Sequence, residues 1–206
     1  MKILVACEFS GIVREAFRAK GHDAWSCDLL PTEIPGQHIQ GDVLEIINNG
    51  WDMMIAHPPC TYLCVTANRS FLNNPDRWGK RLDAMLFVYG LLNADIEKIC
   101  IENPKGVIST HIRKPDQYIQ PYEHGHPDSK MTGLWLKNLP KIQPTEIVEP
   151  EWVVPPSGRR MSKTHANNPS TNNPGNAKLR SRTYQGIAKA MANQWSGQLA
   201  PLEAIA

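Results

Sequence analysis

The chain has 206 residues, a net charge of +2 and 41% hydrophobic residues. This length supports one compact domain with a substantial core and is short for two well-separated domains. The charge is compatible with nucleic-acid binding but does not argue for it, because many DNA-binding proteins are far more basic. No apolar stretch approaches the roughly 20 residues of a membrane span, and the apolar run Met1–Cys7 is too short for a signal peptide. We therefore expect a cytoplasmic protein that makes no membrane contact.

Strand-like and helix-like segments alternate through the first half of the chain. Apolar runs predict strands at 2–7, 22–28, 39–43, 51–56 and 96–102. Helical spacing of apolar residues predicts helices at 11–20, 43–48 and 76–94. The apolar face expected for the last helix consists of Trp78, Leu82, Met85, Leu86, Tyr89 and Leu92. This alternation predicts a single α/β domain with a doubly wound, mostly parallel, Rossmann-like sheet, in which ligands bind beyond the carboxyl ends of the strands.

The second half is rich in proline, asparagine and turn residues, with apolar islands at 132–139 and 147–154. We expect the first island to pack on the sheet. Residues 156–183 contain basic but no acidic side chains, and their asparagine-rich centre cannot bury enough apolar surface to order itself. A basic flexible loop is therefore expected at 156–183. A helix is predicted at 182–195, and its buried residues are expected to be Ile187, Ala188, Met191 and Trp195.

The five cysteines are dispersed, and three of them lie in apolar runs, as is usual for reduced cysteines that serve as small core residues. A disulfide framework is not expected. Cys60 and Cys64 have C-x-x-x-C spacing without a matching second pair, which argues against structural zinc. His124 and His126 lie beside a proline without a third ligand nearby, so a turn is expected there and no metal site.

The first predicted strand runs into Glu8, Phe9, Ser10 and Gly11 before a helix begins. Backbone amides at a helix start can receive an anion such as a carboxylate, and a glycine lets a ligand approach closely. The segment lacks a G-x-G-x-x-G pattern. An ordinary strand-to-helix turn is therefore the simpler interpretation of this segment by itself.

Two aspartates occur at successive predicted strand ends: Asp28 after the second strand and Asp42 after the third. In doubly wound nucleotide-binding folds, the acid that ends the second strand commonly holds ribose hydroxyls. Asp42 would then lie near an adenine ring. Each aspartate taken singly is equally explained as a helix cap or a turn residue.

Cys60 follows Pro58 and Pro59 in a loop just past the predicted strand 51–56. The prolines rigidify the approach to the thiol. A thiolate is the nucleophilic form and is favoured by nearby cations, for which His57 and Arg69 are candidates. These features indicate a fixed nucleophile.

Glu102 and Asn103 follow a second buried apolar run. A carboxylate at such a position costs free energy unless it has a partner, which indicates a role for Glu102. Asn103 can fix its orientation. The alternative is a glutamate that caps the following helical turn. A thiol and a carboxylate at neighbouring strand ends suit covalent chemistry on a pyrimidine ring, with sulfur adding to C6 and the acid binding the ring nitrogen.

In order and spacing, these motifs resemble those of the cytosine C5-methyltransferases. The segment 6–11 is similar to the family's cofactor loop, Asp-Leu-Phe-x-Gly, with Phe9 and Gly11 matching. Pro59–Cys60 matches the Pro-Cys of the catalytic loop, and Glu102–Asn103 matches the Glu-Asn of the Glu-Asn-Val motif. The segment 184–188 is similar to the helix that completes the cofactor pocket. The resemblance covers 1–108 well and 178–195 loosely.

The resemblance implies S-adenosylmethionine-dependent methylation of cytosine C5 in DNA. The implied catalytic residues are Cys60, Glu102 and Asn103. The implied cofactor-binding residues are Glu8, Phe9, Ser10, Gly11, Asp28, Asp42 and Pro58. The implied substrate-binding residues are Pro59, Arg180 and Arg182. It also implies a cofactor-binding and catalytic core at 1–108, a reduced substrate-recognition region at 109–180, and a C-terminal helix at 181–206 that completes the core.

The chain departs from the family in its sparse glycines, in the Thr61–Cys64 part of its catalytic loop and in its short recognition region. It also looks like small methylases encoded by bacteriophages, which implies the host cytoplasm as its location. Two alternatives remain open. The enzyme can act on a free pyrimidine deoxynucleotide, as the short recognition region and modest charge favour, or the chain can be a non-catalytic binder of DNA or nucleotide on the same fold.

Overall fold

The computed structural model describes residues 1–156, 158, 160–167 and 174–197. A seven-stranded sheet forms its centre, with the strand order β3-β2-β1-β4-β5-β7-β6. The neighbours from β3 to β5 pair in parallel, whereas β7 is antiparallel to both β5 and β6. The predicted single α/β domain with a mostly parallel, Rossmann-like sheet is confirmed.

The strands of the sheet are β1 (Lys2–Ala6), β2 (Asp23–Asp28), β3 (His38–Gln40), β4 (Met53–Ala56), β5 (Lys98–Pro104), β6 (Gln117–Ile119) and β7 (Thr132–Lys137). The α-helices are α1 (Ile12–Arg18), α2 (Pro75–Leu92), α3 (Ile108–His111), α4 (Lys163–Asn167), α5 (Pro174–Ser181) and α6 (Gln185–Trp195). Short 3-10 helices are η1 (Val43–Glu45), η2 (Val65–Phe71) and η3 (Pro121–Glu123). The strands β8 (Trp152–Val153) and β9 (Met161–Ser162) form a separate two-stranded sheet. The helix expected at 43–48 is thus only the short η1.

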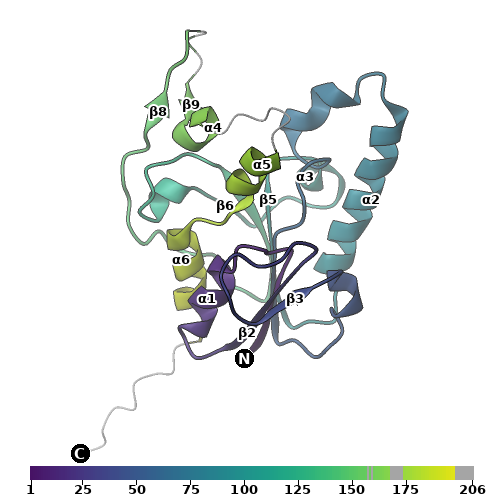
Figure 1. Cartoon of the computed structure of the whole chain (residues 1–206), viewed down its shortest axis with the longest axis vertical. Coiled ribbons are helices and arrows are strands. Elements are labelled where there is room, and N and C mark those ends of the chain that lie inside the picture. The colour runs from purple at the N-terminus through teal and green to yellow at the C-terminus, as the bar shows by residue number, and fades with distance from the viewer. Residues whose placement is uncertain (157, 159, 168–173, 198–206) are drawn as a thin grey trace, which may run out of the picture.

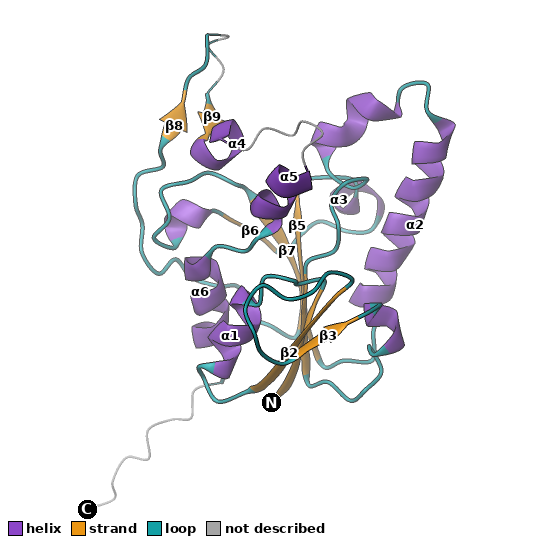
Figure 2. Cartoon of the chain, in the orientation of Figure 1, coloured by secondary structure: helices purple, strands orange, loops and turns teal. Residues whose placement is uncertain are grey.

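Helices cover both faces of the sheet, so the central strands are buried on both sides (Figures 1 and 2). On one face, Val13 and Phe17 of α1 pack with Ile187 and Met191 of α6. On the other face, α2 and α3 contribute to a second apolar cluster. This double burial explains why the strands read as continuous apolar runs. Among the described residues, no helix is long and apolar enough to cross a membrane.

The strand β5 extends further than expected. The sequence predicted its end at Glu102, whereas Asn103 and Pro104 also lie within it. The extension arises because β7 pairs with β5 from Ile99 to Pro104, with Glu102 opposite Leu134 and Pro104 opposite Thr132. Pairing with β4 ends earlier, at Ile101. Beyond Ile101, the loop that follows β4 and begins at His57 therefore lies beside β5 in place of a paired strand.

The apolar face expected for α2 is wrong. The helix turns Val88, Leu91 and Arg81 inward, whereas four of the six expected face residues are largely exposed: Trp78, Leu82, Leu86 and Tyr89. The inward side is fixed by Arg81, whose Nε donates to the carbonyl oxygen of Tyr62 at 2.8 Å. Apolar residues occur on both sides of this helix, so their periodicity does not identify the side that is buried.

The region after residue 108 belongs to the same sheet, because it supplies β6 and β7. The segment 156–183, expected as a basic flexible loop, contains β9, α4 and α5 in its described part, while residues 157, 159 and 168–173 lie outside the described residues. Polar contacts rather than apolar burial hold α5 in place, as described below. The predicted closing helix is confirmed as α6, and its four expected residues are buried.

Candidate functional site

The strand register aligns four polar residues at the carboxyl edge of the sheet. Ala6 pairs with Cys27 and with Ala56, and Ala56 pairs with Ile101. The residues that come next along these four strands therefore lie side by side: Cys7, Asp28, His57 and Glu102. The edge includes the boundary between β1 and β4, where the strand order reverses, which is where doubly wound sheets bind ligands.

A cavity of about 550 Å³ opens at this edge. Asp28, Gly41 and Asp42 line it from the ends of β2 and β3, and Pro59 and Thr61 line it from the loop after β4. The inner side of α2 completes the wall with Lys80, Asp83, Ala84 and Phe87. Part of the cavity wall is thus formed by the loop that carries Cys60.

The two cavity aspartates also organise their own turns. One carboxylate oxygen of Asp28 accepts from the amide of Leu30 at 2.9 Å, and one oxygen of Asp42 accepts from the amide of Leu44 at 2.9 Å. Each side chain therefore acts as the turn or cap acceptor considered above and also borders the cavity. Carboxylates held in this way suit hydroxyl and amino donors of a ligand.

Cys60 lies in a turn that is fastened to the segment after β5. Its carbonyl oxygen accepts from the amides of Leu63 and Cys64, both at 3.0 Å. Cys64 forms an isolated bridge with Gly106, and the amide of Val107 donates to Leu63 at 2.8 Å. Only glycine fits at position 106, because an added Cβ would lie 2.0 Å from the Leu63 oxygen.

The Cys60 thiol is a neutral, partly buried group. Its hydrogen bond with Cys64, together with burial, raises its pKa above the usual range, and the negative charge of Glu102 acts in the same direction. Lys130 lowers the pKa of this thiol. The charges of Glu102 and Lys130 both act on the Cys60 thiol, so the three groups lie in one region. Cys60 comes from the loop after β4, Lys130 from the loop before β7, and Glu102 from β5. All five cysteines of the chain are free thiols.

Glu102 is an ionised carboxylate with several partners. Burial opposes its ionisation, but a hydrogen bond with His57, the charge of Lys130 and a hydrogen bond with Thr132 outweigh burial and hold its pKa below the usual range. The His57 Nδ1 and Glu102 Oε2 atoms are 3.0 Å apart. The Glu102 side chain is 16% exposed, so it is not completely closed off from solvent.

Two buried polar atoms near Cys60 have no hydrogen-bond partner among the described residues. Asn103 donates through Nδ2 to the carbonyl oxygen of Pro58 at 2.7 Å, which fixes the amide and leaves its Oδ1 unpaired. His57 bonds Glu102 through Nδ1, and its Nε2 is unpaired. Unsatisfied buried atoms cost free energy and are common where a ligand binds.

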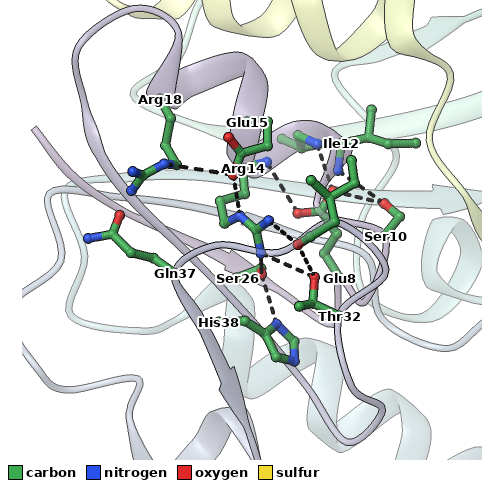
Figure 3. A network of polar contacts seen from close by, with 12 residues as sticks. Glu8, Ser10, Ile12, Arg14, Glu15, Arg18, Ser26, Thr32, Gln37 and His38 are labelled. Carbon is green, nitrogen blue, oxygen red and sulfur yellow. Dashed lines mark hydrogen bonds and ion pairs between the residues drawn. The ribbon is translucent and has the colours of Figure 1, made fainter.

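Side chains of the loop after β1 form hydrogen bonds within the loop and with the start of α1. Glu8 is buried, and its carboxylate accepts from the amide of Val13 at 2.7 Å and from that of Arg14 at 3.2 Å, while Ser10 donates to it at 3.1 Å (Figure 3). Glu8 therefore caps the first turn of α1 with an internal carboxylate. Gly11 adopts a positive φ of 76° at the start of this helix. The sequence suggested the backbone amides at the start of this helix as groups that bind an anion. Two of them, the amides of Val13 and Arg14, instead donate to Glu8.

Arg14 is a fully buried cation that sequence reasoning did not identify. Its guanidinium donates to Glu15 at 2.7 Å, to Ser26 at 2.9 Å, to Thr32 at 3.2 Å and to the Ile34 carbonyl at 2.6 Å (Figure 3). These bonds tie α1 to β2 and to the loop between β2 and β3. That loop follows Asp28, so the network positions one side of the cavity. In the sequence, the only indication of this network is a single arginine beside the apolar positions of a predicted helix.

The described part of the basic segment packs close to the loop after β1. Arg182 pairs with Glu33 through two contacts of 2.8 and 2.9 Å, and Lys178 pairs with Glu33 at 3.2 Å. Lys178 also lies over the ring of Phe9, 4.9 Å from its centre. The carbonyl oxygen of Arg180 accepts from Lys130 at 3.1 Å. Arg182 is therefore committed to an internal ion pair, and Arg180 lies beside a cation that acts on Cys60.

Two histidines considered as metal ligands serve in packing. His126 Nε2 accepts from the amide of Gly186 at 2.8 Å, and His124 Nδ1 lies 3.1 Å from the Thr145 hydroxyl oxygen. Gly186 is required here because a Cβ would lie 1.8 Å from the His124 carbonyl oxygen. These contacts dock the start of α6. Within the described residues, no group of three or more metal-ligating side chains occurs.

No family model matches the chain, and no curated protein matches it. Among solved structures, it is similar to a candidate DNA modification methyltransferase encoded within an E. coli prophage, with a TM-score of 0.47, 16% identity and coverage of 71% of this chain and 51% of that one. It is also similar to the Entamoeba histolytica methyltransferase EhMeth, with a TM-score of 0.48, 15% identity and coverage of 73% and 57%. The chain thus spans about half the length of these structures.

Proposed function

We propose that this protein transfers a methyl group from S-adenosylmethionine to C5 of a pyrimidine base, with cytosine in DNA as the principal substrate. One observation carries the proposal: Pro59 and Thr61, the residues on either side of Cys60, line the cavity at the ends of β2 and β3. A methyl donor held in that cavity would lie beside the loop that carries the thiol. Covalent activation and methyl transfer could then occur on one ring.

The cavity fits the nucleoside part of such a donor. Asp28 and Asp42 offer carboxylate oxygens to ribose hydroxyls and to an amino group, and Val43 and Phe87 provide apolar contact for a flat ring. When bound, the cofactor supplies an electrophilic methyl group. Phe9, Ser10, Gly11 and Pro58 complete the proposed cofactor side. Glu8 belongs to it as the residue that shapes the loop, since its carboxylate is bonded to amides of α1.

In the proposed reaction, the Cys60 thiolate adds to C6 of the base. The resting thiol is neutral because its hydrogen bond with Cys64 and its burial raise its pKa, so it must lose a proton first. Lys130 favours the resulting thiolate because its charge stabilises the anion. Addition at C6 makes C5 nucleophilic, and C5 takes the methyl group. A water molecule acting as base would then take the C5 proton, and the Cys60 thiolate would leave from C6 as the C5–C6 double bond re-forms.

Glu102 is proposed to bind the N3 and N4 edge of the base. Its ionised carboxylate accepts from the exocyclic amino group, and the proton shared with His57 is available when negative charge develops at N3. Asn103 holds the carbonyl of Pro58 and so fixes the approach to Cys60. His57, Lys130 and Thr132 thus act with Glu102 on the base.

A base in duplex DNA must leave the stack to reach Cys60. Pro59 and Arg180 are proposed to contact the substrate, with Arg180 near phosphate. Arg182 can contribute to DNA binding only if substrate competes with Glu33 for its guanidinium. This ion pair favours the second candidate, a free pyrimidine deoxynucleotide, because it removes one of the two expected phosphate contacts.

Trapping of the covalent adduct tests the proposal. The protein is incubated with S-adenosylmethionine and a duplex containing 5-fluorocytosine, in which fluorine blocks the final elimination. We expect a stable protein–DNA adduct whose attachment maps to Cys60 and not to Cys64. A Cys60→Ser variant should give none, and Glu102→Gln should slow its formation. A protein that forms no adduct with duplex or single-stranded DNA would contradict cytosine methylation in DNA.

Substrate and cofactor can be tested separately. Methyl transfer to a deoxycytidine nucleotide is compared with transfer to a duplex under identical conditions, and preference for the nucleotide would favour the second candidate. Isothermal titration calorimetry with S-adenosylmethionine should show binding that Asp28→Ala weakens. The absence of any heat of binding would favour the non-catalytic alternative over both enzymes.

A further inference from the structure

The outer side of α2 carries an exposed apolar stripe. It consists of Trp78, Leu82, Leu86 and Tyr89, whose exposed fractions are 52%, 60%, 68% and 57%. Their spacing places them on one face of the helix. Together they present on the order of 500 Å² of apolar surface, which is large for a single patch on a monomer. At one end the stripe adjoins η2, where the rings of Trp78 and Phe71 pack edge to face with their centres 5.2 Å apart.

Two glycines share this face. Gly79 and Gly90 lie three helical turns apart, each next to an aromatic residue of the stripe. Neither has a positive φ, and a Cβ added at either position would meet nothing within 4 Å. Each glycine costs the helix about 1 kcal/mol relative to alanine. The monomer therefore gives no steric reason for glycine at these positions, whereas close approach by another side chain would.

The stripe is complementary to itself when α2 is read in the opposite direction. Reversal about Ala84 places Trp78 opposite Gly90, Tyr89 opposite Gly79, and Leu82 opposite Leu86. Each large aromatic ring then meets a position without a side chain, and the two leucines meet at the centre. None of these six positions carries a charge.

We propose that α2 is a self-association surface through which two copies of this chain pair in an antiparallel, two-fold symmetric arrangement. In a two-fold interface, a residue and its counterpart meet twice, so a self-complementary pattern is what such pairing requires. The glycines let the two helices approach closely while the aromatic rings fill the space above them. An unrelated partner would require an apolar stripe but not this alternation of large and small residues about one centre.

The proposed interface leaves the candidate site open. The residues of α2 that line the cavity are Lys80, Asp83, Ala84 and Phe87, none of which belongs to the stripe. The pairing is therefore independent of the proposed methyl transfer. Loss of one need not abolish the other, and the two proposals can be tested separately on the same variants.

Sedimentation velocity of the full chain over a hundredfold range of concentration tests the pairing. We expect a dimer at the higher concentrations, and Leu82→Glu should shift the protein to monomer while its far-UV circular dichroism and Tm remain those of a folded protein. Ile147→Glu is the matched control, because Ile147 is 75% exposed outside α2, and it should leave the dimer intact. A monomer at every concentration, or a dimer that persists in Leu82→Glu, would overturn the proposal.

A second variant distinguishes the specific pairing from non-specific hydrophobic association. Gly90→Leu adds apolar surface and a better helix former at a position with free space in the monomer. Non-specific association would become stronger. The proposed pairing should weaken by about tenfold or more, because the new side chain overlaps Trp78 of the partner. Tighter association of Gly90→Leu would refute the antiparallel arrangement.

Discussion

Gly106→Ala tests whether the contact between the Cys60 turn and the segment after β5 controls the candidate nucleophile. A Cβ at this position would lie 2.0 Å from the Leu63 carbonyl oxygen and 2.9 Å from the Cys64 Cα. Since real Cβ contacts begin at 3.0 Å, the two segments must separate by about 1 Å. Such a shift moves the turn that contains Cys60.

The expected loss of stability follows from the bonds that this separation stretches. The amide of Val107 donates to Leu63 at 2.8 Å, and that of Val65 donates to Lys105 at 3.2 Å. Two backbone hydrogen bonds at about 1 kcal/mol each, plus residual strain, predict a decrease of about 2–4 kcal/mol in the free energy of unfolding. Urea denaturation measures it. The control is Gly41→Ala, where a Cβ meets nothing within 4 Å.

The displacement should also slow the reaction of the folded variant. Displacement of a reacting atom by about 1 Å can reduce a rate on the order of 100-fold. We therefore expect the rate of fluorocytosine adduct formation to fall by about that factor in Gly106→Ala, measured at a temperature where the variant is folded. A variant with an unfolding free energy within about 0.5 kcal/mol of the parent chain, or with an unchanged rate, would refute this account of the turn.

Three further predictions concern polar contacts outside the Cys60 turn. Arg14→Met should lower the unfolding free energy by about 3 kcal/mol, because it removes a fully buried cation with four hydrogen-bond acceptors; a loss below about 1 kcal/mol in urea denaturation would contradict this. Burial opposes ionisation of Asp128, but hydrogen bonds, including one from Tyr184, keep its pKa below the usual range. The ionised Asp128 carboxylate therefore stabilises the fold above about pH 4, and this stabilisation is lost as the pH falls through the pKa of Asp128 in the folded protein. Asp128→Asn should flatten the dependence of Tm on pH in this acidic range. Glu33→Gln removes the ion pair between Glu33 and Arg182, which directly follows α5, and should therefore speed hydrogen exchange in α5. The Tm should change little because the charged groups are solvated. Unchanged exchange would show that other contacts hold α5.

The structure brings together several residues that the sequence placed at strand ends. Cys60 and Glu102 were paired from motif order, and both lie at the carboxyl edge of the sheet within electrostatic reach of each other. Asp28 and Asp42 were chosen as acids at strand ends, and both border the cavity. These residues could be found because the ends of parallel strands converge at one edge, so position along the chain predicts position in space.

Other residues of the site could not be found in this way. Lys130 acts on Cys60 and Glu102 from the loop before β7, a strand that returns antiparallel beside β5. His57 is a candidate cation for Cys60 in the sequence, but in the structure its Nδ1 forms a hydrogen bond with Glu102. Arg81 supports the Cys60 turn from a side of α2 that its periodicity did not identify. Each of these contacts joins segments that are distant in sequence and has no local pattern.

The amino-acid sequence by itself determined the alternation of strands and helices and the α/β sheet, because apolar periodicity and turn residues are local properties. It also identified the closing helix α6 from one clear apolar face. Tertiary structure decided the length of β5, the buried side of α2 and the order within 156–183. In each case, the deciding contact is made with a distant segment: pairing with β7, the bond from Arg81 to Tyr62, and the ion pair of Arg182 with Glu33.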